Sequence, residues 1–141
     1  MKFGAVAKWC KKMDKNTFIS VRLTSGSIRI FKEAIRLMDN PKFIRFSVNE
    51  EGTLLAVEPY HRKTFTSFTV PKNLYSYSGA MVVYSKSLCT LLYNRLHWNK
   101  DKLYRIPGKI LKEQKTAVFD LTNAVCYNGN SSDKAFQGES L

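Results

Sequence analysis

The sequence predicts an α+β fold built from two tandem strand–helix–strand–strand repeats. Three observations support this prediction. Residues 27–57 and 82–121 follow the same order of elements, in which apolar alternation with a period of two flanks short stretches of helical spacing. The chain has 141 residues and is 44% hydrophobic, which suits one globular domain. Two repeats in one chain would form a pseudo-dimeric small β-barrel or sandwich with short helices.

Residues 1–17 are expected to form a basic N-terminal arm or a short helix. Within this segment, apolar and basic side chains fall on opposite sides of a helix: Val6, Trp9, Cys10 and Met13 against Lys8, Lys11, Lys12 and Lys15. Because so short a helix is marginal on its own, it would dock on the domain or fray. In both cases the lysines remain available to an anionic partner.

The first repeat is expected to span residues 18–60. Phe18–Leu23 alternates as a half-buried strand, and Gly26 marks a turn before the next extended segment. A helical stripe follows, formed by Phe31, Ala34, Ile35 and Met38.

Asn40 and Pro41 should end that helix, since Asn tolerates a left-handed cap and Pro cannot continue a helix. Residues 43–48 and 54–57 then read as a hairpin whose loop, Asn49–Gly52, contains a glycine suited to positive φ.

Residues 61–80 are expected to form an edge strand at 64–70 and a linker.

Residues 81–126 are expected to form the second repeat. Ser85 is a candidate cap for a helix with the apolar stripe Leu88, Leu91, Leu92 and Leu96. Aligning Lys32 with Lys86 brings residues 43–46 opposite 103–106 and 54–57 opposite 117–120. Pro107 and Gly108 are expected to interrupt the second hairpin, and residues 127–141 to form a disordered tail.

The charge of the chain indicates its partners. Lys and Arg number 23 against 11 Asp and Glu, which gives a formal net charge of +12. Such a field attracts polyanions and accelerates encounter with them. DNA or RNA is the first expectation, an acidic protein the alternative, and a merely solubilising surface a third interpretation.

One segment carries a family resemblance. The run Gly26–Arg36 (GSIRIFKEAIR), followed by Ile44, Phe46, Val48 and residues 54–58, resembles the AbrB/SpoVT/MazE swapped-hairpin family of transcription factors and antitoxins. The likeness lies mainly in residues 22–58. It departs at Phe31, where the family has a proline, and at Asn40, where it has a glycine.

The resemblance implies interlocked hairpins that present basic strands and loops to DNA, and hence transcription regulation. Family members are usually dimers; this chain would be a monomer with an internal pseudo-dimer, or a homodimer. The same likeness places Arg22, Arg29, Lys32 and Arg36 where the family carries DNA-contacting or dimer-organising charge. An antitoxin-like or mobile-element protein that binds an acidic protein is the alternative.

The candidate nucleic-acid-binding residues are therefore basic ones from three regions: Lys8, Lys11, Lys12, Arg22, Arg29, Lys32, Arg36, Arg62 and Lys63. The last two stand beside Tyr60, His61 and Phe65, and exposed aromatic rings beside cations can stack bases. Basic and aromatic residues also mix from Tyr93 to Lys102, but there the aromatic rings are more simply explained as closing the core.

No catalytic motif is recognisable, so the sequence predicts a protein that is not an enzyme and needs no cofactor or metal. Three cysteines without a CxxC pair argue against a zinc site and against a disulfide framework. A hidden site that combines His61 or His97 with a cysteine stays open as an alternative. No apolar run is long enough to span a bilayer, and a cytoplasmic location is expected.

Overall fold

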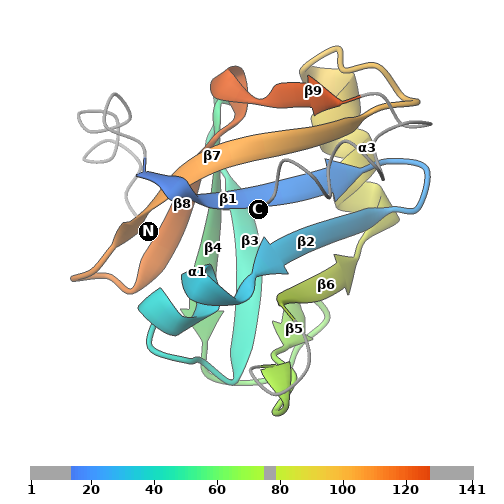
Figure 1. Ribbon diagram of the computed structural model, residues 1–141. Helices are drawn as coiled ribbons and strands as arrows, with labels where there is room; N and C mark the ends of the chain where they lie inside the picture. Colours follow the sequence, from blue (N-terminus) through green and yellow to red (C-terminus); the bar gives the residue numbers. More distant parts are fainter. Residues whose placement is uncertain (1–13, 75–78, 128–141) are drawn as a thin grey trace.

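The computed structural model describes residues 14–74 and 79–127. Within them the chain forms a small α+β domain whose antiparallel strands curl into a nearly closed barrel (Figure 1). Residues up to 60 form β1 (Asp14–Arg22), β2 (Ser27–Phe31), α1 (Lys32–Leu37), β3 (Phe43–Val48) and β4 (Leu54–Tyr60). Later residues form β5 (Ser67–Thr69), β6 (Ala80–Tyr84), α3 (Lys86–Arg95), β7 (Leu103–Leu111), β8 (Thr116–Asp120), a 3-10 turn η3 (Leu121–Asn123) and β9 (Val125–Tyr127). The predicted α+β class and small barrel are confirmed.

The strands follow the order β5-β3-β4-β8-β7-β1-β2-β6 around the barrel. β7 pairs with three strands: with β1 along one edge, and with β9 and β8 in succession along the other. β5 and β6 end the order, and among the described residues no pairing joins them. One more pairing would therefore close the barrel.

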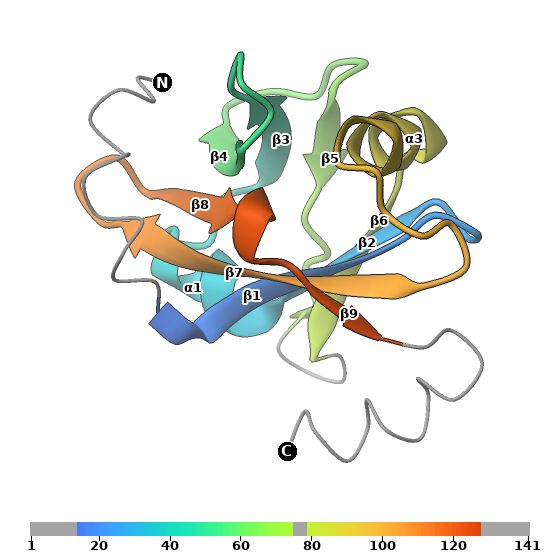
Figure 2. The same cartoon turned by 90° about the horizontal axis from the view of Figure 1, so that it is seen from above.

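Helices α1 and α3 lie at opposite ends of the barrel, α1 at the lower left and α3 at the upper right in Figure 1. Helix α1 buries Ala34 and Ile35, and α3 buries Cys89, Leu92 and Tyr93. Seen from above, α3 and the strands β3, β4 and β5 lie on one side of the layer formed by β7, β1 and β2 (Figure 2).

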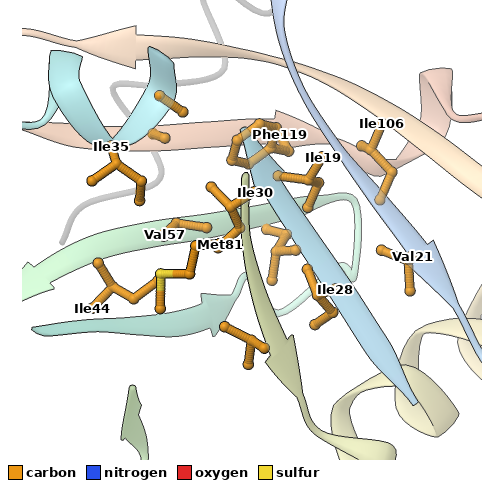
Figure 3. Close-up of a cluster of buried hydrophobic side chains, with 14 of the residues drawn as sticks. Ile19, Val21, Ile28, Ile30, Ile35, Ile44, Val57, Met81, Ile106 and Phe119 are labelled. Atoms are coloured by element: carbon orange, nitrogen blue, oxygen red, sulfur yellow. The ribbon is translucent and has the colours of Figure 1, made fainter. Parts of the chain in front are cut away.

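The interior of the barrel is a single apolar core. Every strand from β1 to β8 except β5 contributes a buried side chain, and Ile35 of α1 joins them (Figure 3). Along β1 the fully buried residues are Ile19 and Val21, and along β2 they are Ile28 and Ile30. Because successive side chains of a strand point to opposite faces, the residues between them face outward.

Several local predictions are confirmed, and each rests on backbone geometry that the residue type favours. Gly26 (φ 63°) and Gly52 (φ 73°) occupy the predicted turns in the left-handed region. Asn40 (φ 48°) follows α1, so the predicted end of the first helix is confirmed. The hairpin at 49–52 is held by the Asn49 side chain, whose Oδ1 accepts hydrogen bonds from the N–H groups of residues 53 and 54.

The prediction for Pro107 and Gly108 is wrong, because both residues lie inside β7. Pro107 pairs with Phe18 of β1, and Gly108 pairs with Phe119 of β8. Gly108 is required there by packing, since a Cβ at this position would lie 2.3 Å from Phe119 Cδ1. The irregularity that β7 does show lies in its pairing with β1, where the register shifts between Asp14 and Phe18, as at a β-bulge.

The remaining differences concern boundaries and one helix face. Helix α3 is capped by Ser85 as predicted, but Leu91 is 46% exposed while Cys89 and Tyr93 are buried in its place. The expected arm at 1–17 overlaps β1, which begins at Asp14; residues 1–13, with the expected helix, lie outside the described part of the chain. The expected tail at 127–141 begins one residue too early, because Tyr127 ends β9; residues 128–141 lie outside the description.

Candidate nucleic-acid interface

The outer face of β6, β2, β1, β7 and β9 gathers arginines and aromatic rings. Cross-strand registers fix two neighbouring rows on it, because directly opposed residues share a face. One row runs Tyr84–Ser27–Arg22–Leu103–Tyr127, and the next runs Val82–Arg29–Ser20–Arg105–Val125. We call this surface the arginine–aromatic face and define it by Phe18, Arg22, Arg29, Phe31, Tyr84, Arg105 and Tyr127.

Arg105 is held against the sheet between two rings. Its Cζ lies 4.3 Å from the ring centroid of Phe18 and 5.3 Å from that of Tyr127. Both distances are within the range of cation–π attraction, which contributes about 0.5–1 kcal/mol at exposed sites and more where water is excluded. The guanidinium is therefore held against the sheet, with its Nε and Nη2 atoms buried.

A second arginine, Arg29, and a third ring, Phe31, continue this layer along β2. Arg29, which is exposed, has its Cζ 5.8 Å from the centroid of the Phe31 ring. The rings of Phe31 and Phe18 lie 4.5 Å apart at an interplanar angle of 51°. Ser20 lies between Arg29 and Arg105 in the same row and is 3% exposed, so these larger side chains leave little of the strand surface open around it.

The face is electropositive because of its sequence. The strands β2, β6, β7 and β9 contain no Asp or Glu, while β2 and β7 contribute Arg29, Arg105 and Lys109. Three acidic residues elsewhere have cationic partners: Glu33 pairs with Arg36, Glu58 with Arg45 and Asp39 with Lys115. β1 adds one acidic residue, Asp14, at its start. Basic residues therefore outnumber acidic ones on the strands of this face, which favours an anionic ligand there.

The structure brings together only some of the residues that the sequence predicted for binding. Arg22 and Arg29 lie on the arginine–aromatic face. Lys32 begins α1 directly after Phe31, at the border of the face. Arg36 is exposed on α1, where its guanidinium pairs with Glu33.

The other predicted residues lie elsewhere. Arg62 and Lys63 are exposed in the loop between β4 and β5, which belongs to the half of the strand order opposite β1 and β2. Lys8, Lys11 and Lys12 fall outside the described residues. The nine candidates therefore do not form one site.

Sequence reasoning missed five members of the face, Phe18, Phe31, Tyr84, Arg105 and Tyr127. Arg105 carried a signal, since it stands in an alternating strand pattern and aligns with Arg45 of the first repeat. Tyr84 and Tyr127 carried none, because their place in the row with Arg22 depends on pairings between distant strands. The face also combines both expected repeats, whereas all the predicted binding residues precede the second repeat.

Of the histidines and cysteines that could form an alternative site, the structure describes His61, His97, Cys89 and Cys126, whereas Cys10 lies outside the described residues. No group of three metal-ligating side chains occurs among residues 14–74 and 79–127. Cys89 is buried in α3, its thiol facing the carbonyl oxygen of Ser27 at 3.8 Å, and burial raises its pKa to about 11. His61 packs against Tyr60, and His97 adopts φ 57° directly after α3, where its backbone N–H donates to the carbonyl oxygen of Asn94.

The aromatic rings between Tyr93 and Lys102 pack in the core, as the interpretation that they close the core predicted. Tyr93 is 1% exposed, and its hydroxyl contacts the carbonyl oxygens of Val21 (3.1 Å) and Lys102 (2.5 Å). Burial raises the pKa of this phenol well above its usual value near 10. Trp98 stacks on Tyr104 with 4.3 Å between ring centroids, so both rings close this end of the barrel.

Over the described ranges, no helix is long and apolar enough to cross a membrane. Comparisons with family models, with curated proteins and with solved structures found no match to this chain.

Proposed function

We propose that this protein is a non-enzymatic nucleic-acid-binding protein whose ligand lies on the arginine–aromatic face. The observation that carries the proposal is the convergence of Arg22, Arg29 and Arg105 with aromatic rings on strands whose one acidic residue is Asp14, at the start of β1. Arginine is the residue best suited to this task, because its planar guanidinium both binds phosphate oxygens and stacks on rings. Transcription regulation in the cytoplasm is the role that the family resemblance suggests for such a protein.

The proposal includes the architecture, an AbrB-like internal pseudo-dimer. One repeat would comprise β1, β2, α1, β3 and β4, and the other β5, β6, α3, β7 and β8. In this arrangement β1 corresponds to β5, β2 to β6, β3 to β7 and β4 to β8. The strand order supports it, because the pairing β1–β7 then corresponds to β5–β3, and β3–β4 corresponds to β7–β8. The pairings β2–β6 and β4–β8 each join two equivalent strands, so exchanging the repeats leaves them unchanged. Two pairings lack a counterpart: β1–β2, whose equivalent would close the open seam between β5 and β6, and β7–β9, because β9 belongs to neither repeat.

Equivalent side chains give independent support. Arg45 of β3 is opposite Ser67 of β5, just as Arg105 of β7 is opposite Ser20 of β1. Both serines are buried, and both arginines lie with Cζ 4.3 Å from the centroid of an aromatic ring, Tyr60 for Arg45. Such agreement is expected of a duplicated unit.

Backbone contacts between the repeats are also reciprocal. At the start of α1, the N–H of Lys32 donates to the carbonyl oxygen of Gly79 at 3.0 Å. At the start of α3, the N–H of Ser85 donates to the carbonyl oxygen of Gly26 at 2.8 Å. Both bonds continue the antiparallel β2–β6 pairing by one residue at each end, so each helix begins at the edge where the two proposed repeats pair.

The binding test is fluorescence anisotropy of labelled oligonucleotides titrated with the whole protein at several salt concentrations. If about six phosphates are neutralised, log affinity falls against log salt with a slope of about −5. Arg29→Ala should weaken binding and reduce the magnitude of that slope by about 0.9, the contribution of one phosphate contact. The matched control is Arg62→Ala, which removes the same charge from an exposed loop off the face.

Three results would remove the proposal. They are absence of binding at about 50 mM salt, an equal effect of the two substitutions, and displacement of the oligonucleotide by an equal charge concentration of polyglutamate. The last result would favour the alternative, an acidic protein partner, because polyglutamate supplies charge without bases or phosphates.

A further inference from the structure

Tyr84 is the most accessible ring of the arginine–aromatic face. It is 71% exposed and stands on β6, at the end of the strand order. Its neighbour Val83 is 2% exposed and points into the core, so the alternation of the strand fixes Tyr84 on the outer side. An exposed aromatic ring on an edge strand is a liability for a soluble protein, since edge strands with apolar side chains promote association.

We propose that this face binds single-stranded nucleic acid, with a base stacked on Tyr84. The inference rests on the proposed function and specifies its ligand. A base is planar and has a π-face whatever its identity, so an exposed ring offers it a contact that requires no particular sequence. Unstacked bases are available only in single strands, loops and ends.

The shape of the face favours a single strand over a duplex. Reading a duplex requires an element that enters a groove, such as a helix or a two-stranded ribbon. The described residues of this face supply none, because they belong to one continuous layer of strands and the helices α1 and α3 lie at the ends of the barrel (Figures 1 and 2). A layer of rings and guanidinium planes can instead contact bases that are splayed out from a strand.

The row that contains Tyr84 also provides the path for such a strand. Tyr84 and Tyr127 end the row, and Arg22 stands between them, with one strand separating it from each. Four strand spacings separate the two tyrosines, a distance of about 19 Å. A single strand crossing the sheet would meet a ring, then cationic groups from Arg22 and the adjacent Arg29, and then a second ring.

The experiment compares Tyr84→Ala, Tyr84→Trp and Phe65→Ala in the anisotropy assay, with a single-stranded oligonucleotide and its duplex. Phe65 is the matched control, because it is a fully exposed ring on the β4–β5 loop, away from the face. Tyr84→Ala should weaken single-strand binding about 5- to 150-fold, the loss expected for one stacked base at about 1–3 kcal/mol. Tyr84→Trp should retain binding and show tryptophan quenching, and Phe65→Ala should bind like the unchanged protein.

A second readout separates stacking from charge. The salt slope should stay the same in Tyr84→Ala, because stacking releases no counterions, whereas Arg29→Ala should reduce it. If Arg29→Ala weakens binding and Tyr84→Ala does not, or if the duplex binds as tightly as the single strand, the stacking inference is wrong while the proposed function stands. If Tyr84→Ala converts a dimer to a monomer in light scattering, the ring serves association through the β6 edge and the inference is likewise overturned.

Discussion

Lys115 and Asp39 form an ion pair across 76 positions of the sequence, with 2.8 Å between Lys115 Nζ and Asp39 Oδ2. The pair joins the turn between β7 and β8 to the segment that follows α1. At the other end of the barrel, the guanidinium of Arg95, the last residue of α3, donates to the carbonyl oxygen of Glu50 in the turn between β3 and β4. In each case the end of a helix holds a hairpin turn of the other proposed repeat, so these contacts should matter to the assembly of the barrel.

The Asp39 pair makes a pH-dependent contribution to stability. The hydrogen bond from Lys115, followed by the charge of its ammonium group, lowers the pKa of Asp39 below its usual value of 3.8. A carboxyl whose pKa is lowered by folding stabilises the fold above its unfolded-state pKa, and this stabilisation is lost as pH falls through the folded-state value. Lys115→Met should therefore unfold at a lower temperature than the unchanged protein at about pH 6, and the two should converge below about pH 3.

The effect should be small, because both side chains are more than half exposed and surface pairs contribute little. Lys112→Met is the matched control, since it removes a lysine from the same turn and leaves the pair intact. Thermal unfolding followed by circular dichroism across the pH range provides the measurement. A difference between Lys115→Met and Lys112→Met that persists unchanged at low pH would contradict the assignment.

Gly108 should be intolerant of any side chain. A Cβ there would lie 2.3 Å from Phe119 Cδ1 and 2.6 Å from the carbonyl oxygen of Val118. Phe119 is completely buried, so it has no free space into which to move, and overpacking of this kind costs about 1–3 kcal/mol. Gly108→Ala should lower the midpoint of urea unfolding accordingly.

Gly79→Ala is the control for that experiment, because nothing lies within 4 Å of a Cβ added at Gly79. This variant should fall within about 0.5 kcal/mol of the unchanged protein, as surface substitutions usually do. Equal midpoints for the two variants would mean that β7 and β8 do not pack as closely as described.

Ser85 should stabilise the start of α3 through its side chain. Its Oγ accepts a hydrogen bond from the N–H of Leu88 at 3.4 Å, which satisfies one of the donors left free in the first turn of a helix. Ser85→Ala should cost about 0.5–2 kcal/mol of stability. Ser87→Ala, an exposed position within the same helix, should be neutral or slightly stabilising, because alanine has the higher helix propensity.

Local features of this fold were predictable from the sequence because they depend on residues close together in the chain. The turn at Gly26, the hairpin at Asn49–Gly52 and the helix end at Asn40 each require a residue type that tolerates positive φ. The helix cap at Ser85 likewise depends on a group three residues away. The same signals misled at Pro107, because proline is typical of loops and its place inside β7 is decided by pairing with β1.

The candidate site was predictable only in part, for the same physical reason. Arg22 and Arg29 were named as binding residues through the family resemblance, and the alternating strand patterns in which they stand are local as well. Their convergence with Arg105 and the two tyrosines depends on the order of strands around the barrel. That order brings β6 and β9 to the sides of β1, β2 and β7, and no local pattern encodes it.

Cys89 should be chemically inert in the folded protein, and its reactivity therefore reports the opening of α3. Its thiol is completely buried, and burial raises its pKa from 9.0 to about 11, so almost none of it is thiolate at about pH 8. Because folding raises the pKa of the Cys89 thiol, the thiol contributes fully to stability below about pH 9, its unfolded-state pKa. This contribution is lost as pH rises through the folded-state pKa.

Cys126 is exposed in β9 and should be alkylated by iodoacetamide under native conditions. Peptide mass spectrometry should find Cys126 modified within minutes and Cys89 modified only in denaturant. Ser85→Ala, which loosens the first turn of α3, should accelerate modification of Cys89, whereas Ser87→Ala should not. Modification of Cys89 at the rate of Cys126 in the native protein would show that α3 does not pack on the barrel as described.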